Sequence, residues 1–140
     1  MSKPCPVVHF EMPYADRNRM AQFYKSAFGW QMQMMGEDMG NYVLALTTET
    51  ANGCATTPGH INGGFFPAST GSPIQQHPSV VIAVEDIETA IESVASAGGK
   101  VLGQAMQIPG IGLYVAFADT EGNHCSMLQP LRPDGCQKAS

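Results

Sequence analysis

The stretch VVHFEMPYADRNRMAQFYKSAFGW, residues 7–30, decides the fold. It begins with β-branched and aromatic residues, which favour a β-strand. Asp16 then offers a helix N-cap, and Gly29 offers a C-cap. Between them, apolar residues recur at the i, i+3, i+4, i+7 spacing of one helix face: Met20, Phe23, Tyr24 and Ala27. The stretch therefore predicts a strand that is followed at once by an amphipathic helix.

The rest of the chain repeats this order. In the first half, the sequence predicts further strands over residues 30–34, 42–47 and 61–66. In the second half, it predicts strands over residues 80–84, 100–106, 113–118 and 124–128. Asp86 caps the second helix, and a shift of 70 residues aligns it with Asp16 and aligns Gly99 with Gly29. The sequence therefore predicts an internal repeat of two βαβββ modules.

The length of 140 residues predicts one domain, which spans the whole chain. We expect module one over residues 6–67, a polar linker over 68–78, module two over 79–130 and a tail over 131–140. A module of this size leaves one sheet face uncovered, so the modules are expected to pair, within the chain or across a dimer. The charged share of only 14% fits such a paired assembly.

Composition argues against two classes of partner. The net charge is −5 and only seven Lys and Arg are present, so we expect no nucleic-acid binding. The longest aliphatic run, residues 80–84, falls far short of the roughly 20 residues of a membrane-spanning helix. No apolar signal core precedes the first strand, and we expect a cytoplasmic protein.

The four cysteines are Cys5, Cys54, Cys125 and Cys136. They lack the C-x-x-C spacing of zinc knuckles and thioredoxin-like motifs. A chain of this length does not need a disulfide framework, so we expect reduced thiols. A bridge between Cys5 and Cys136 stays open, as does the redox state of both residues.

Several motifs resemble one known family. The segments HFEMP (9–13), FYKSAFGW (23–30) and ADTEGN (118–123) resemble the glyoxalase/bleomycin-resistance/dioxygenase superfamily, also called vicinal oxygen chelate proteins. The resemblance covers about residues 7–130, and INGG (61–64) is similar to an uncharacterised glyoxalase-like subgroup. It implies an α+β fold in which two βαβββ modules form a curved mixed-sheet cleft. It also implies a homodimer.

Active members of that family hold a divalent metal with one ligand from the first and last strands of each module. By resemblance, the four ligand positions fall on His9, on Gly63 or Gly64, on Ser79 and on Ser126. Only His9 is a metal-binding side chain, whereas catalytic metal sites normally need three protein ligands. The sequence thus departs from the family at the residues that carry its best-known chemistry.

Strand alternation offers a substitute set of ligands. Residues i and i+2 of a strand share a face, so Glu11 joins His9, and His124 joins Ser126. Two histidines and one carboxylate form a recognised triad for iron-type chemistry. A rebuilt site of His9, Glu11 and His124 could therefore hold zinc, nickel, manganese or iron. The alternative is that His9 and Glu11 hydrogen-bond each other or the opposing strand in a polar cleft.

Two functions follow from these alternatives. The first is binding of a small, partly apolar ligand without a metal, in a cleft shaped by His9, Glu11, Ser79, His124 and Ser126. The second is a metal-dependent enzyme, a glyoxalase-type lyase or isomerase or else a dioxygenase. In that enzyme Glu11 is the carboxylate placed to act as the general base. The sequence leaves open whether the protein is an enzyme.

Overall fold

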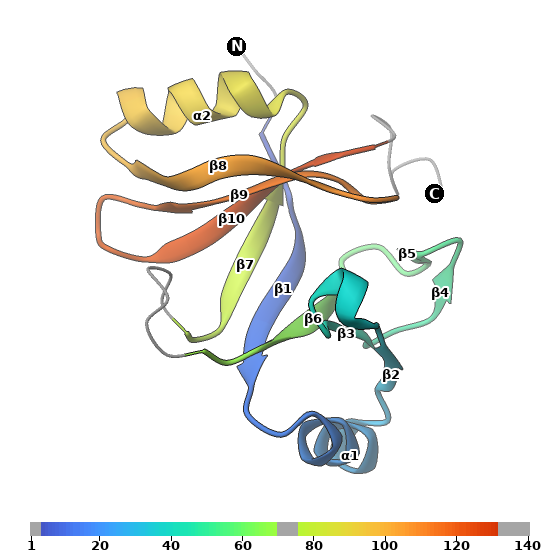
Figure 1. The fold of residues 1–140 in the computed structure, drawn as a ribbon. Coiled ribbons are helices and arrows are strands. Elements are labelled where there is room, and N and C mark those ends of the chain that lie inside the picture. Colours follow the sequence, from blue (N-terminus) through green and yellow to red (C-terminus); the bar gives the residue numbers. More distant parts are fainter. Residues whose placement is uncertain (1–3, 70–75, 132–140) are drawn as a thin grey trace. The chain divides into compact units, whose positions relative to one another are not determined.

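A computed structural model of the chain describes residues 4–69 and 76–131 (Figure 1). The chain divides into two compact units. Among the described residues, the first unit holds residues 9–69 and 76–78, and the second holds residues 4–8 and 79–131. Each unit combines an α-helix with a mixed β-sheet, which is the predicted α+β class.

The sheet of the first unit has the strand order β2-β3-β6-β1. Its elements are β1 (Val7–Tyr14, of which the residues from His9 onward belong to this unit), α1 (Arg17–Phe28), β2 (Gln31–Met34), a 3-10 helix η1 (Glu37–Met39), β3 (Val43–Leu46) and β6 (Asn62–Pro67). β1 runs parallel to β6, whereas β3 is antiparallel to both β2 and β6. The first strand of the unit therefore lies beside its last strand.

Capping and apolar spacing explain why α1 begins and ends where the sequence predicts. The Asp16 side chain accepts a hydrogen bond from the Arg19 amide at 3.0 Å, and Gly29 ends the helix with φ of 74°. The apolar residues of α1 pack on the buried side chains of the sheet, which are Val43, Ala45 and Phe65. The core of this unit therefore lies between α1 and one face of its sheet.

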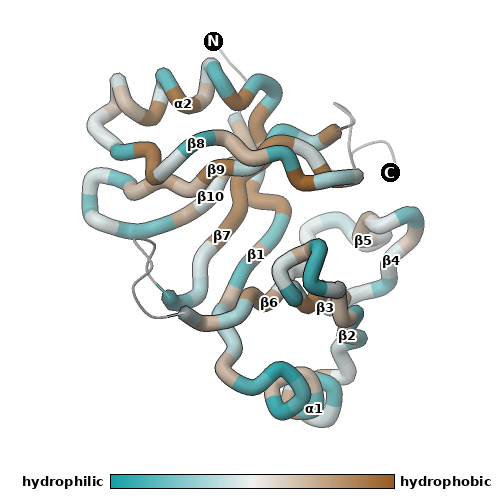
Figure 2. Tube along the Cα trace, in the orientation of Figure 1, coloured by the Kyte–Doolittle hydropathy of each residue, from teal (hydrophilic) through white to brown (hydrophobic). Residues whose placement is uncertain are grey.

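The second unit repeats this arrangement. Its elements are β7 (Ser79–Ala83), α2 (Ile87–Ser96), β8 (Lys100–Ile108), β9 (Gly112–Ala118) and β10 (His124–Pro130). The strand order is β8-β9-β10-β7, and β7 again runs parallel to the last strand, β10. Polar and apolar residues alternate along α2 (Figure 2), whose apolar face packs on Val115 and Met127. The recurrence of helix, strand order and parallel pair confirms the predicted repeat of two βαβββ modules.

The polar segment between β3 and β6, where the sequence predicts no strand, contains regular secondary structure. It contains a small hairpin of β4 (Thr50–Ala51) and β5 (Cys54–Ala55). Asn62 accepts a hydrogen bond from the Thr47 amide at 2.8 Å and donates one to the Thr50 hydroxyl at 3.0 Å. Polar residues predict a loop, but here their side chains supply the hydrogen bonds that hold the hairpin.

The cysteines differ in part from expectation. Cys5 and Cys125 are free thiols, whereas Cys54 is disulfide-bonded. The expectation of reduced thiols is therefore wrong at Cys54, because a chain that needs no disulfide to fold can still form one. A Cys5–Cys136 bridge is excluded because Cys5 is free. Cys136, most of the expected tail and most of the expected linker lie outside the described residues.

Neither α-helix in the part of the chain that the structure describes has the length and apolar character needed to cross a membrane. The longer of its two α-helices, α1, has 12 residues.

Candidate functional site

His9 and Glu11 lie on one face of β1 because strand residues alternate. The intervening Phe10 and the following Met12 pack in the core that α1 covers. His9 and Glu11 therefore project from the opposite face of the first unit's sheet. Both side chains are half-buried.

Tyr42, just before β3, connects these two side chains. Its hydroxyl donates a hydrogen bond to Glu11 Oε2 at 3.0 Å and lies 2.9 Å from His9 Nε2. Because the phenol has a single proton, which goes to Glu11, His9 Nε2 must be the donor in the second bond. The arrangement is a polar network of an imidazole, a phenol and a carboxylate.

Glycine at position 64 makes room for this network. A Cβ atom at Gly64 would overlap the Tyr42 hydroxyl, and one at Gly63 would overlap the Phe10 ring. Phe10 belongs to the core, so Gly63 faces α1 whereas Gly64 faces the side of His9 and Glu11. Of the two glycines that the resemblance aligns with a metal-ligand position, Gly64 is therefore the one on the face of His9.

Burial determines the charge of His9. Loss of hydration lowers the pKa of His9 from its ordinary 6.5 to about 4. The imidazole is therefore neutral at physiological pH. A neutral imidazole with its proton on Nε2 carries a lone pair on Nδ1, which can accept a hydrogen bond.

The predicted site residues of the second unit also share one face. Ser126 is buried, and its Oγ lies 2.7 Å from the Tyr114 hydroxyl. His124 precedes Ser126 by two residues on β10, and Ser79 lies two residues before Val81, the β7 partner of Ser126. Phe117 lies on the opposite face, in the core under α2. Tyr114 is thus the aromatic residue of β9 that accompanies the predicted site residues.

The first unit does not fit the family's metal half-site. His9 Nε2 and Glu11 Oε2 are both at hydrogen-bonding distance from one phenol, and Gly64 has no side chain to offer. Neither unit, over its described residues, brings together three His, Cys, Asp or Glu side chains that could hold a metal. A single imidazole and a single carboxylate are fewer ligands than catalytic metal sites normally use. A triad with His124 would need both units and stays a prediction.

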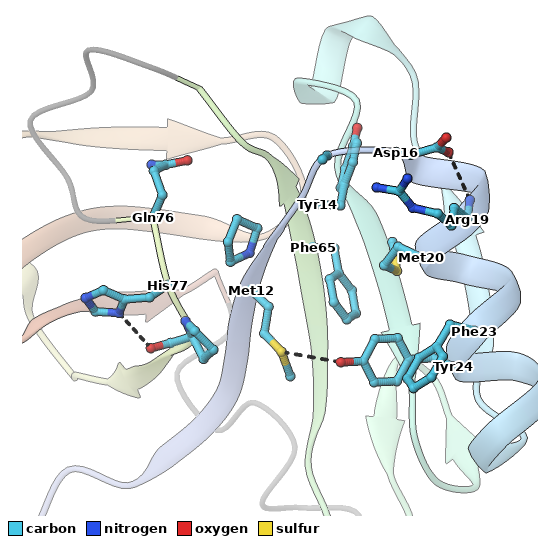
Figure 3. Close-up of a pocket in the computed structure, with 13 residues that line it drawn as sticks. Met12, Tyr14, Asp16, Arg19, Met20, Phe23, Tyr24, Phe65, Gln76 and His77 are labelled. Carbon is cyan, nitrogen blue, oxygen red and sulfur yellow. Dashed lines mark hydrogen bonds between the residues drawn. The ribbon is translucent and has the colours of Figure 1, made fainter.

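A pocket of about 540 Å³ lies on the opposite side of the first sheet, beside α1 (Figure 3). Met12, Phe65, Met20 and Tyr24 supply much of its apolar lining, and the Tyr24 hydroxyl points to the Met12 sulfur at 3.9 Å. None of the predicted site residues lines it. The pocket is therefore separate from the network of His9, Tyr42 and Glu11.

Sequence reasoning missed Tyr42. Tyr42 is 33 residues from His9 in the chain, and its position depends on the pairing of β3 with β6. A partial signal was present, because Val43 and Ala45 alternate as core residues and Tyr42 precedes them in phase with Leu44. That pattern gives the face of Tyr42 but not its partner.

Comparison with known proteins finds one family. Residues 7–126 match the model of the Glyoxalase/Bleomycin resistance protein/Dioxygenase superfamily. A glyoxylase-like domain-containing protein of Didymella fabae is 31% identical over 118 residues, which cover 81% of this chain and 84% of that protein. The putative glyoxylase CFP32 of Mycobacterium bovis is 31% identical over 70 residues, half of this chain and 26% of that protein.

Solved structures share the fold at low sequence identity. Methylmalonyl-CoA epimerase from Mycobacterium tuberculosis has a TM-score of 0.64 at 15% identity, covering 90% of this chain and 88% of its own. The hypothetical protein BH1468 from Bacillus halodurans has a TM-score of 0.66 at 14% identity, covering 93% and 97%. At these identities the likeness extends to the fold alone.

Proposed function

Since the chain belongs to the Glyoxalase/Bleomycin resistance protein/Dioxygenase superfamily, we propose that it binds a small, partly apolar ligand without the family's usual metal. The binding surface is the face of the first sheet that carries His9, Glu11 and Tyr42. The observation that carries the proposal is the Tyr42 hydroxyl, which fills the space that a side chain at position 64 would need. In this proposal, a hydrogen-bonded phenol takes the place of a metal ligand.

The network provides the polar part of this surface. Each of its members is held by another: His9 by Tyr42, and Tyr42 by Glu11. Pre-positioned polar groups raise affinity because less side-chain entropy is lost on binding. Leu44, which pairs with Gly64 and alternates with the core residues Val43 and Ala45, supplies an apolar neighbour on the same face.

The second unit, taken by itself, carries the other residues that the sequence predicts to bind a ligand. Ser79, His124 and Ser126 share a face of its sheet, and Tyr114 fixes the Ser126 hydroxyl. These groups are side chains that form hydrogen bonds. They suit a ligand that is recognised by hydrogen bonds.

We also propose that the protein is a homodimer, as the sequence predicts. Phe23 and Phe28 of α1 are 57% and 64% exposed, and large exposed apolar side chains that lie together often mark an interface. Light scattering coupled to size-exclusion chromatography should give twice the mass of one chain. A monomer at all concentrations would contradict this part of the proposal. A cytoplasmic location stays a prediction.

The ligand-binding proposal is tested by a fragment screen observed in ¹H–¹⁵N spectra of the labelled protein. We expect hits whose shift changes centre on Glu11, Tyr42 and Gly64. Tyr42→Phe removes the bridging hydroxyl and should weaken those hits by about tenfold, the value of one hydrogen bond. Tyr14→Phe is the matched control, because the Tyr14 hydroxyl bonds to the Asn41 carbonyl instead. A screen whose hits leave this face unperturbed would contradict the proposal.

A further inference from the structure

We propose, on the basis of this binding function, that the ligand presents a hydroxyl, thiol or N–H group to Nδ1 of His9, which accepts its hydrogen bond. The inference goes beyond ligand binding as such, because it assigns the chemical class of the group that this face recognises. It also gives His9 a role as an acceptor, at the position where the family places a metal ligand.

The direction of the hydrogen bonds in the network determines which nitrogen of His9 carries the proton. The Tyr42 hydroxyl gives its only proton to Glu11 Oε2, so the contact between Tyr42 and His9 Nε2 requires a proton on that nitrogen. A neutral imidazole carries one N–H group. With Nε2 protonated, Nδ1 is a lone-pair acceptor.

The other ring nitrogen of His9, Nδ1, is accessible. Within residues 4–69 and 76–131, the hydrogen bond of the His9 ring is the one that Nε2 makes with Tyr42. Every buried side-chain nitrogen or oxygen in those ranges has a hydrogen-bond partner. Nδ1 has none there, so it keeps some accessible surface, and that surface is where the proposed ligand contacts it.

The fixed tautomer makes His9 selective for ligands that carry a hydrogen-bond donor. Tyr42 and Glu11 hold the imidazole in one tautomer, so His9 offers an acceptor and not a donor at its open nitrogen. A ligand with a donor at this point gains a hydrogen bond. A ligand with only an acceptor places two lone pairs against each other and leaves Nδ1 unpaired. We expect the difference in affinity to be about tenfold.

The tautomer is measured directly by long-range ¹H–¹⁵N correlation on the full chain near neutral pH. We expect His9 to show a proton-bearing Nε2 and a bare Nδ1. Tyr42→Phe should shift the ring towards a mixture of tautomers, whereas the control Tyr14→Phe should leave it unchanged. A proton on Nδ1 in the wild-type protein would overturn the inference and leave the ligand-binding proposal intact.

Recognition of a donor is measured with phenol and anisole, which share a ring but differ in the hydroxyl proton. We expect phenol to bind this face about ten times more tightly than anisole and to shift the His9 Nδ1 resonance. In Tyr42→Phe the preference should fall towards one. Equal binding of the two probes would overturn the inference alone. No response of this face to either probe would count against both the inference and the proposed function.

Discussion

The absence of a side chain at Gly64 leaves room for the Tyr42 hydroxyl. The family resemblance predicts a missing metal ligand at Gly63 or Gly64. In the structure, the missing side chain is the space that the Tyr42 hydroxyl occupies between His9 and Glu11. The backbone of Gly64 does not need a positive φ, so its requirement for glycine is steric.

We therefore expect Gly64→Ala to lower the free energy of unfolding by about 1–3 kcal/mol, the usual cost of overpacking. In a Tyr42→Ala background the clash is absent, and the same Gly64→Ala change should cost close to nothing. Urea unfolding of the four proteins in this double-mutant cycle measures the coupling. An equal cost of Gly64→Ala in both backgrounds would show that Tyr42 does not occupy this space.

His9 should make stability depend on pH. Its pKa is about 4 in the folded protein and about 6.5 when unfolded, so the unfolded chain binds the extra proton first. The contribution of His9 to the free energy of unfolding is therefore fully present above about pH 6.5, and it is lost as the pH falls towards 4. The expected loss between pH 7 and pH 4.5 is on the order of 2–3 kcal/mol, at roughly 1.4 kcal/mol per pKa unit.

Urea unfolding at the two pH values measures this loss, and His9→Gln is the control that should remove most of it. Hydrogen bonds lower the pKa of Asp86 and of Asp119. These two carboxyl groups change stability in a different pH range, because their hydrogen bonds are lost mainly below about pH 4. A wild-type protein as stable at pH 4.5 as at pH 7 would contradict the burial of a neutral His9.

Among the elements, the hairpin of β9 and β10 positions the candidate residues of the second unit. Tyr114 on β9 and Ser126 on β10 meet across it, and its register extends to the pair of Gly112 with Pro130. Gly112 has a φ of 150° and lies so close to β10 that a Cβ atom would overlap the Gln129 carbonyl oxygen. The end of this hairpin thus requires glycine for two separate reasons.

A comparison of two glycines tests this requirement. Gly103 on β8 has a φ of 105° at a register shift, but a Cβ atom there would meet no other atom within 4 Å. Gly103→Ala should cost about 1 kcal/mol of backbone strain. Gly112→Ala adds a clash with backbone, so its thermal midpoint should fall at least twice as far. Equal shifts for the two variants would contradict the close approach at Gly112.

At the scale of the whole molecule, the predictable part of the fold is the repeat. Asp16 and Asp86 both cap helices, and apolar spacing marks the face of each helix, so local sequence was sufficient for these elements. The pairing of β1 with β6 and of β7 with β10 depends on contacts far apart in the chain. The hairpin after β3 escaped prediction because its polar residues bond to one another.

The candidate site also has a part that could be predicted from the sequence and a part that could not. His9 and Glu11 could be placed on one face because the strand period is two residues. Tyr42 could not be assigned to them, because it reaches them through the register of β3 on β6 and through the open space at Gly64. The free state of Cys5 and the disulfide state of Cys54 likewise depend on distances that spacing does not give.

We propose that a phenol, an imidazole and a carboxylate, without a metal, form the polar centre of the first unit. Elemental analysis of the full chain tests it most directly, after equilibration with zinc, nickel, manganese and ferrous iron and removal of excess ions. We expect metal contents well below one ion per chain, unchanged in His9→Gln. One ion per chain in the wild-type protein that is lost in His9→Gln would contradict it.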